Sequence, residues 1–98
     1  MGTTYSNSQF NAYNEVSINF RQWDSVNNNS IGVEYAVVDK KIGADVEYGK
    51  TTQYVSNPNN NTLVAFSVGS NVTHKNCNLR IKVKEGGNVR GYGELYQR

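Results

Sequence analysis

Cys77 and His74 are the residues most able to form a nucleophile and its base, and each is the only one of its type in this sequence. A thiol becomes nucleophilic when a nearby imidazole takes its proton. Catalytic pairs of this kind usually come from separate segments and include an Asn or Asp that orients the histidine. These two residues are three positions apart, and no orienting residue is identifiable. We therefore expect Cys77 to be a buried, inert thiol.

Asp45 and Glu47 form the clearest carboxylate pair. They are two positions apart, so both side chains lie on one face of a strand. Paired carboxylates can hydrolyse a glycosidic bond. Two acids on a short strand more often face solvent, however, and a domain this small rarely forms a deep cleft. We expect no catalytic residues and a protein that is not an enzyme.

Motifs for cofactors and metals are missing from the sequence. It has no glycine-rich phosphate loop, no Gly-x-Ser-x-Gly turn and no His-Glu-x-x-His. A single histidine disfavours zinc. Asp39, Asp45 and the Asn clusters offer oxygen ligands for calcium, but no loop has the twelve-residue helix–loop–helix spacing. We expect neither a cofactor nor a metal.

Arg80, Lys82 and Lys84 form a cationic row on one strand. Nucleic-acid binding normally uses more phosphate contacts than three cations provide. Charge is also unevenly distributed: up to Gly49, three bases and six acids give −3, and from Lys50 onward, seven bases and two acids give +5. We expect the two halves to attract each other in the fold, and we do not expect nucleic acid as a partner.

The last strand, Val89–Arg98, offers the best candidate binding surface. Its aromatic and charged residues alternate with glycines and therefore share one face. Aromatic rings beside charges and amides suit stacking on sugar C–H faces, and Tyr and Arg also dominate protein–protein hot spots. Trp23, which precedes an Asn-rich loop, is a second aromatic anchor. The candidate ligand-binding residues are Trp23, Tyr92, Tyr96, Arg90 and, from the Asn-rich loops, Asn28 and Asn60.

A structural interpretation of the same residues is open. Tyr92 and Tyr96 would then point inward, and Gly91 and Gly93 would let a neighbouring sheet or arm approach closely. Trp23 would cover the edge of the core.

Composition and alternation predict the elements that position these residues. The chain has fifteen Asn, nine Gly and seven Tyr, a balance typical of strands joined by tight turns. In Asn76–Lys84 apolar residues alternate with polar ones, which predicts a half-buried strand with a cationic outer side. Thr62–Ser70 is almost continuously apolar, which predicts a strand covered on both faces. The five residues Asn71–Lys75 would join the two as a hairpin.

Other segments show the same alternation or clear turn residues. Further strands are expected at Asn14–Trp23, Ile31–Asp39, Ala44–Tyr48, Thr51–Ser56 and Val89–Arg98. Turns are expected at Lys40–Gly43, Gly49–Lys50 and Asn57–Asn61, with a hairpin turn at Glu85–Asn88.

These elements predict one all-β domain over residues 1–98. We expect an antiparallel β-sandwich of immunoglobulin-like or jelly-roll character with seven or eight short strands, or alternatively a partly closed barrel. Residues 1–13 would form an edge strand or an ordered arm.

Low charge and abundant Asn, Ser, Thr and Tyr favour a protein that works outside cells. We expect a secreted or cell-surface module, without its leader, from a bacterium or phage, since no disulfide can form. Its expected partner is a carbohydrate, a cell-surface component or another protein. Alternatives are a small toxin, bacteriocin or hydrolase inhibitor, and a structural subunit of a fibre or virion that forms homo-oligomers through an edge strand. No membrane-spanning segment is expected.

Overall fold

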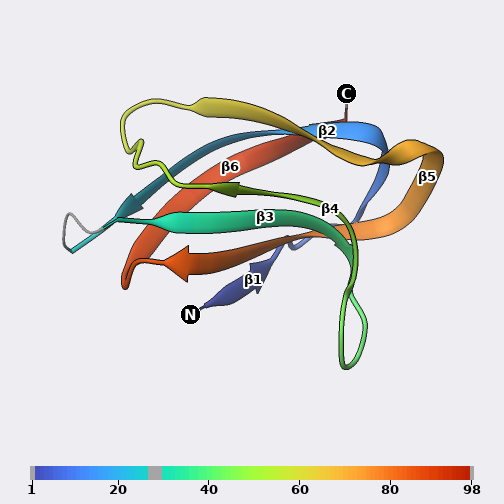
Figure 1. The fold of residues 1–98 in the computed structure, drawn as a ribbon, viewed down its shortest axis with the longest axis horizontal. Helices are drawn as coiled ribbons and strands as arrows, with labels where there is room; N and C mark the ends of the chain where they lie inside the picture. Colours follow the sequence, from blue (N-terminus) through green and yellow to red (C-terminus); the bar gives the residue numbers. More distant parts are fainter. Residues whose placement is uncertain (1, 27–29, 98) are drawn as a thin grey trace.

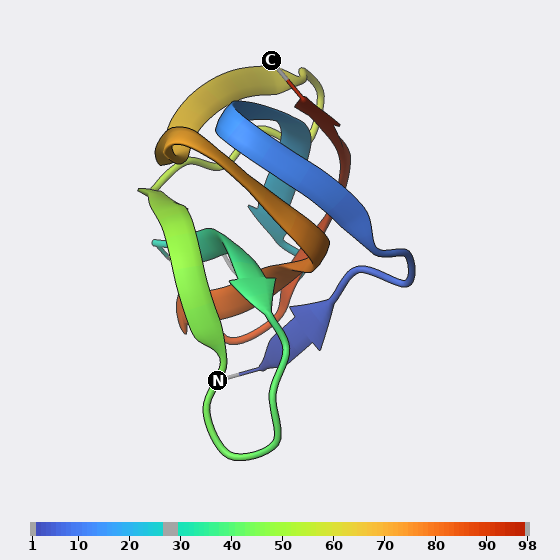
Figure 2. The ribbon, with the colours of Figure 1, turned by 90° about the vertical axis from the view of Figure 1, so that its right-hand side faces the viewer.

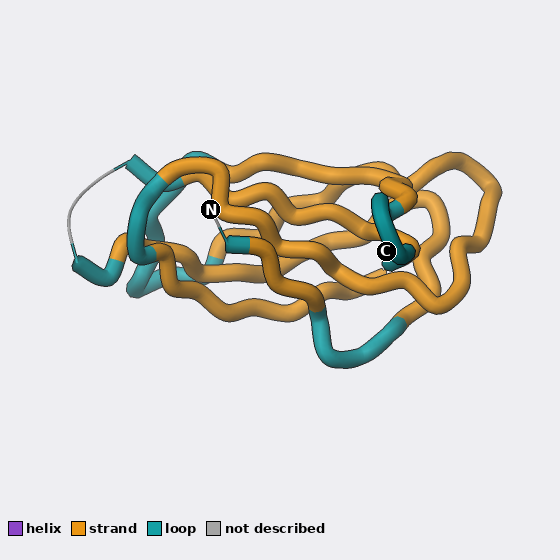
Figure 3. Tube along the Cα trace, turned by 90° about the horizontal axis from the view of Figure 1, so that it is seen from below, coloured by secondary structure: helices purple, strands orange, loops and turns teal. Residues whose placement is uncertain are grey.

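The computed structural model describes residues 2–26 and 30–97, which form β-strands joined by short loops (Figures 1 and 3). The six strands are β1 (Thr3–Tyr5), β2 (Phe10–Asp24), β3 (Gly32–Asp39), β4 (Val46–Gln53), β5 (Thr62–Glu85) and β6 (Val89–Gln97). The prediction of an all-β antiparallel fold is confirmed, with six strands in place of seven or eight. Because the described residues include no helix, none of them forms a helix that could cross a membrane.

The strands form one antiparallel sheet in the order β4-β3-β5-β2-β6, and β1 also pairs with β5. The 24-residue strand β5 is the central strand of this sheet. The first part of β5 pairs with β2, and its last part pairs with β3 on one side and β1 on the other. In Figure 1, β5 runs along the upper side of the molecule, bends at the right-hand end and returns along the lower side.

The predicted hairpin link at residues 71–75 is wrong, because this segment is the bend inside β5. Positive φ angles at Gly69, Asn71 and Asn76 mark the bend, and Gly and Asn tolerate that conformation better than other residues. The register of β2 against β5 shifts at the same place. Polar residues of turn type therefore bend a continuous strand here (Figure 2).

The first part of β5 is covered on one face only, which corrects the prediction that both faces are buried. Phe66 and Val68 are buried, whereas Leu63 is 62% exposed and Ala65 is also exposed. The strand lies at the surface of the folded sheet, so alternate residues face solvent in spite of the apolar run.

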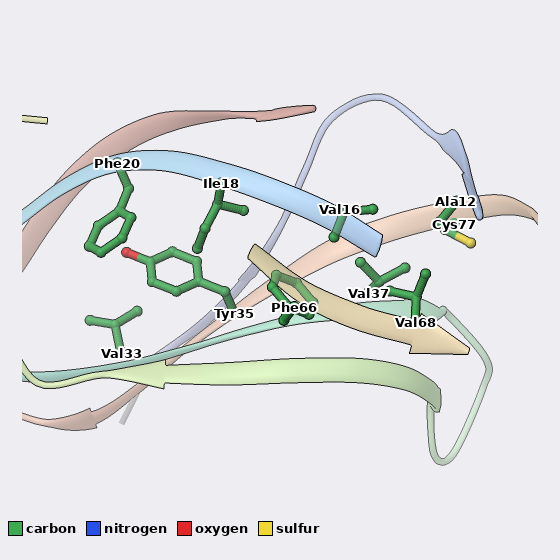
Figure 4. Packing of buried hydrophobic residues seen from close by; sticks show 10 residues of the cluster. All are labelled: Ala12, Val16, Ile18, Phe20, Val33, Tyr35, Val37, Phe66, Val68 and Cys77. Carbon is green, nitrogen blue, oxygen red and sulfur yellow. The ribbon is translucent and has the colours of Figure 1, made fainter. Parts of the chain in front are cut away.

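The core lies where the inner faces of β2, β3 and β5 meet (Figure 4). As predicted, alternate residues of β2 point inward, and Val16, Ile18 and Phe20 are at most 2% exposed. Val33 and Val37 of β3 face them from the opposite side. The buried cluster comprises Ala12, Val16, Ile18, Phe20, Val33, Tyr35, Val37, Phe66, Val68 and Cys77.

Two predicted turns are wrong. Residues 49–50 lie inside β4, so the segments 44–48 and 51–56 are not separate strands. Gly49 instead allows close packing, since a Cβ placed there would lie 1.9 Å from the main-chain oxygen of Ser67 in β5. Residues 85–88 do connect β5 to β6, but β6 pairs with β2, so this connection is not a hairpin.

Residues 1–13 were predicted to be an edge strand or arm. The short strand β1 pairs with residues 80–82 of β5, in agreement with an edge strand. Residues 10–13 belong to β2 instead, because that strand extends beyond the predicted start at Asn14.

Candidate functional site

Pairing of β2 with β6 brings two aromatic residues together on the outer face of the sheet. Trp23 lies opposite Arg90, and Arg21 lies opposite Tyr92. Residues opposite each other in an antiparallel pair share one face. The Trp23 and Tyr92 rings meet edge to face, with centroids 6.3 Å apart and planes at 85°. The Arg21 guanidinium carbon lies 5.6 Å from the centroid of the Tyr92 ring, at cation–π range.

This surface faces solvent. Tyr92 is 60% exposed and Tyr96 is 46% exposed, so the interpretation in which both rings point inward is wrong. Its other part is only half right. Gly91 and Gly93 do allow a close approach, but the backbone against them belongs to β2, the strand paired with β6 in the same sheet, and not to a neighbouring sheet or arm. A Cβ at Gly93 would lie 2.4 Å from the main-chain oxygen of Asn19. We call Arg21, Trp23, Arg90, Tyr92, Glu94 and Tyr96 the aromatic face.

The loop that joins β4 to β5 borders the aromatic face. Arg21 Nε donates to Asn61 Oδ1 at 2.6 Å, and Asn57 exchanges hydrogen bonds with the main chain of Gln22. Asn60, a predicted site residue, is exposed in this loop next to Asn61. The Asn61 amide therefore lies beside Arg21, whose guanidinium contacts the Tyr92 ring. Asn28, the other predicted Asn, lies outside the described residues.

A buried hydrogen-bond network supports the sheet beneath this surface. The Tyr35 hydroxyl donates to Gln22 Oε1 at 2.7 Å, and Gln22 Nε2 donates to the carbonyls of Gln53 and Val55, both at 2.9 Å. Gln22 is 1% exposed, and burial raises the pKa of Tyr35. The network joins β2, β3 and the end of β4 at the residue that precedes Trp23.

Tyr96 and Glu94 add a polar pair to the aromatic face. The Tyr96 hydroxyl donates to the Glu94 carboxylate, and this hydrogen bond raises the pKa of Tyr96. The face thus combines aromatic rings, two guanidinium groups, a carboxylate and nearby amides. These groups can stack on an apolar surface and exchange hydrogen bonds with hydroxyls around it.

The sequence reasoning missed Arg21 as a member of this surface. A signal was present, because Arg21 lies two positions before Trp23 and so shares its strand face. What the pattern did not reveal is that Tyr92 lies opposite Arg21. That pairing depends on β6 crossing over to β2.

Arg80, from the predicted cationic row, forms an ionic cluster with Glu34 and with the predicted carboxylate pair Asp45 and Glu47. Arg80 is 6% exposed and pairs with Glu34 at 3.1 Å, with Asp45 at 3.3 Å and with Glu47. The prediction that Arg80 faces solvent is therefore wrong. The hydrogen bond from Tyr5 is the main cause of the lowered pKa of Asp45, and the hydrogen bond from Arg80 lowers the pKa of Glu47.

Asp45 and Glu47 both pair with Arg80. The expectation that they face solvent is wrong for Asp45, whose side chain is 7% exposed, whereas the Glu47 side chain keeps 37% of its surface exposed. Among the described residues, no group of three or more His, Cys, Asp or Glu could hold a metal ion. The cluster joins the acidic and basic halves of the chain, and Lys84 adds a contact to Glu34 at 3.6 Å. The expected attraction between the two halves is thus confirmed at this cluster.

Cys77 and His74 do not form a thiol–imidazole pair. The Cys77 thiol is buried, and its hydrogen bond at 3.4 Å goes to the main-chain oxygen of His74. The His74 ring stacks on Tyr48 with centroids 3.7 Å apart, and its Nε2 lies 2.7 Å from the Val68 carbonyl oxygen. Burial raises the pKa of Cys77, which disfavours a thiolate. The burial of Cys77 therefore agrees with the buried, inert thiol expected from the sequence.

The aromatic face is therefore the strongest candidate site in the part of the chain that the structure describes. Comparison of the chain with protein-family models, with curated proteins and with solved structures finds no match.

Proposed function

We propose that this chain is a non-enzymatic binding module that recognises a carbohydrate through the aromatic face. The observation that carries the proposal is the solvent-exposed Tyr92 ring, held edge to face by Trp23 and flanked by the Arg21 guanidinium. Rings fixed by such contacts lose little conformational freedom when a ligand binds. A sugar ring would stack on Tyr92, and Arg90, Glu94 and the neighbouring Asn side chains would bind its hydroxyls.

We also propose the context and architecture that suit this role. The folded sheet works as a two-layered sandwich of immunoglobulin-like or jelly-roll character, because the inner faces of β2 and β3 oppose each other across the core. The close packing of Gly49 in β4 against Ser67 in β5 partly closes the folded sheet, as in a barrel. The module acts outside the cell, as a secreted or cell-surface protein of a bacterium or phage. Low charge and abundant Asn support that location.

The test is a glycan array screened with the labelled protein, followed by titration of each bound glycan. Tyr92→Ala and Trp23→Ala should each weaken binding about tenfold, the loss expected for a hot-spot aromatic residue. Tyr54→Ala is the matched control, because Tyr54 is 63% exposed and is not part of the aromatic face. Circular dichroism checks that each variant is folded. Unchanged affinity in both folded variants would contradict this site.

A protein ligand at the cell surface is the other partner that the aromatic face fits, since Tyr, Trp and Arg are the usual anchors of protein interfaces. Binding to whole cells that is lost with Tyr92→Ala but survives enzymatic removal of surface glycans would identify a protein partner. Growth inhibition by the purified protein would favour the toxin or inhibitor role instead.

A structural subunit of a fibre or virion is the second candidate function. The observation in its favour is β6, which pairs with β2 on one side only in the described residues. A free edge strand can continue a sheet into another chain. Electron microscopy of the concentrated protein would show filaments under this alternative and discrete particles under the main proposal.

A further inference from the structure

In the part of the chain that the structure describes, β6 pairs with β2 alone, and its other edge borders an apolar cavity of about 350 Å³. All six residues from 89 to 94 line this cavity, although alternate side chains of a strand point to opposite faces. The strand therefore faces the cavity with its backbone edge. The wall from the last part of β5 is apolar and includes Leu79, Ile81 and Val83. Unpaired backbone groups beside an apolar surface favour an added strand as the occupant.

The residues along β6 are self-complementary. Arg90, Tyr92 and Glu94 follow one another on the exposed face. If two copies of β6 pair antiparallel with Tyr92 opposite Tyr92, each Arg90 lies opposite Glu94 of the second copy. One such pairing therefore forms two oppositely charged pairs, and opposite charges across strands stabilise a sheet. The carboxylate of Glu94 has two oxygens, so it can accept from both Tyr96 and an arginine.

The inner face of β6 fits the same register. Val89 would lie opposite Leu95 of the second copy, and both side chains are partly buried against the core cluster in each chain. Gly91 would lie opposite Gly93, so no side chain hinders the approach of the two strands. A register centred on Gly93 would instead place Arg90 opposite Tyr96 and lose both charge pairs.

We propose that two copies of this chain associate through β6, antiparallel and centred on Tyr92, to form one continuous sheet. The twofold axis of such a dimer is perpendicular to the sheet, so both aromatic faces lie on the same side. The two copies of the Trp23–Tyr92 pair then lie next to each other and can bind a ligand with repeated sugar units at two points. Binding at two points raises the overall affinity without new contacts.

Sedimentation equilibrium of the full chain over a concentration series tests the dimer without any ligand, so its result does not depend on the proposed carbohydrate binding. The wild type should dimerise. Arg90→Glu and Glu94→Arg should each raise the dimer dissociation constant at least tenfold, because like charges would then lie opposite each other. The double variant R90E/E94R should restore dimerisation. Lys75→Glu, a charge reversal at an exposed position of β5, should leave it unchanged.

Three outcomes would overturn the proposal. They are a wild type that stays monomeric up to millimolar concentration, a dimer that tolerates Arg90→Glu, and a double variant that is no better than either single variant. Circular dichroism of every variant separates loss of pairing from loss of folding.

Disulfide trapping tests the register. Tyr92→Cys should give a cross-linked dimer under mild oxidation, because the two copies of residue 92 face each other across the pair. Tyr96→Cys should not cross-link, because its two copies would be eight residues apart along the strands. The native Cys77 is buried and does not compete. Cross-linking through position 96 but not 92 would show a different register and contradict the proposal.

Discussion

Gln22 and Tyr35 place paired polar groups inside the core of this protein. Gln22 occupies the inward phase of β2 after Val16, Ile18 and Phe20, and its amide is fully engaged with Tyr35 and two main-chain carbonyls. A buried amide is tolerated only when its donors and acceptors are paired. This network therefore depends on each partner being present.

Replacement of Tyr35 by Phe should lower the free energy of unfolding by about 1–3 kcal/mol, because Gln22 Oε1 would be left buried without its donor. Urea denaturation measures the change. Tyr13→Phe is the control, since the Tyr13 hydroxyl makes an exposed hydrogen bond to Asn71 and its loss should have little effect. Equal effects of the two substitutions would show that the buried bond has no special role.

Among the elements, β5 decides the fold because it belongs to both parts of the sheet. The alternation of its last part was readable in the sequence, and so was the burial of Cys77. The alternating burial of its first part was not, because the apolar run there predicted burial on both faces. Its continuity was not, because a polar segment between two strands has the composition of a loop whether the chain reverses or bends. The same limit applies to β6, whose sequence does not say which strand it pairs with.

Gly49 tests the packing of β4 against β5. Alanine at this position should destabilise the fold by about 1–3 kcal/mol, because its Cβ would overlap the Ser67 carbonyl oxygen and force the strands apart. Gly87→Ala is the matched control, because a Cβ there has no neighbour within 4 Å. Thermal unfolding of both variants measures the difference. A wild-type melting temperature for Gly49→Ala would show that β4 does not pack this closely.

At the scale of the whole molecule, the ionic cluster ties the acidic half of the chain to the basic half. Glu34 belongs to β3 and Glu47 to β4, and both pair with Arg80 of β5. Removing one member of a buried ion pair leaves an unpaired charge, which costs about 3–5 kcal/mol in proteins. The cluster thus makes the stability of the fold depend on pH.

Acid should destabilise this protein through Asp45 and Glu47. Their pKa values are lowered in the folded state, so as pH falls below the ordinary carboxyl range the unfolded chain binds protons first. The stabilisation is present above the unfolded pKa values, near pH 4, and is lost as pH falls through the lower folded values. Urea midpoints measured between pH 7 and pH 2 should show this loss. Asp45→Asn should flatten the profile relative to Glu85→Gln, a substitution at an exposed position.

The candidate surface was predictable in part. Arg90, Tyr92 and Tyr96 could be grouped because they alternate along one strand, and this grouping needs no tertiary information. The contact of Trp23 with Tyr92 could not be foreseen, since it joins strands that are far apart in the sequence.

The sequence by itself determined the all-β class, the inward phase of β2, and the attraction between the halves of the chain, because these follow from local alternation and net charge. Only the tertiary structure decided that β5 is one bent strand, that Arg80 is buried among carboxylates and that β6 lies beside β2. Those features arise from pairings between distant segments, and side-chain alternation within a strand carries no information about its neighbour.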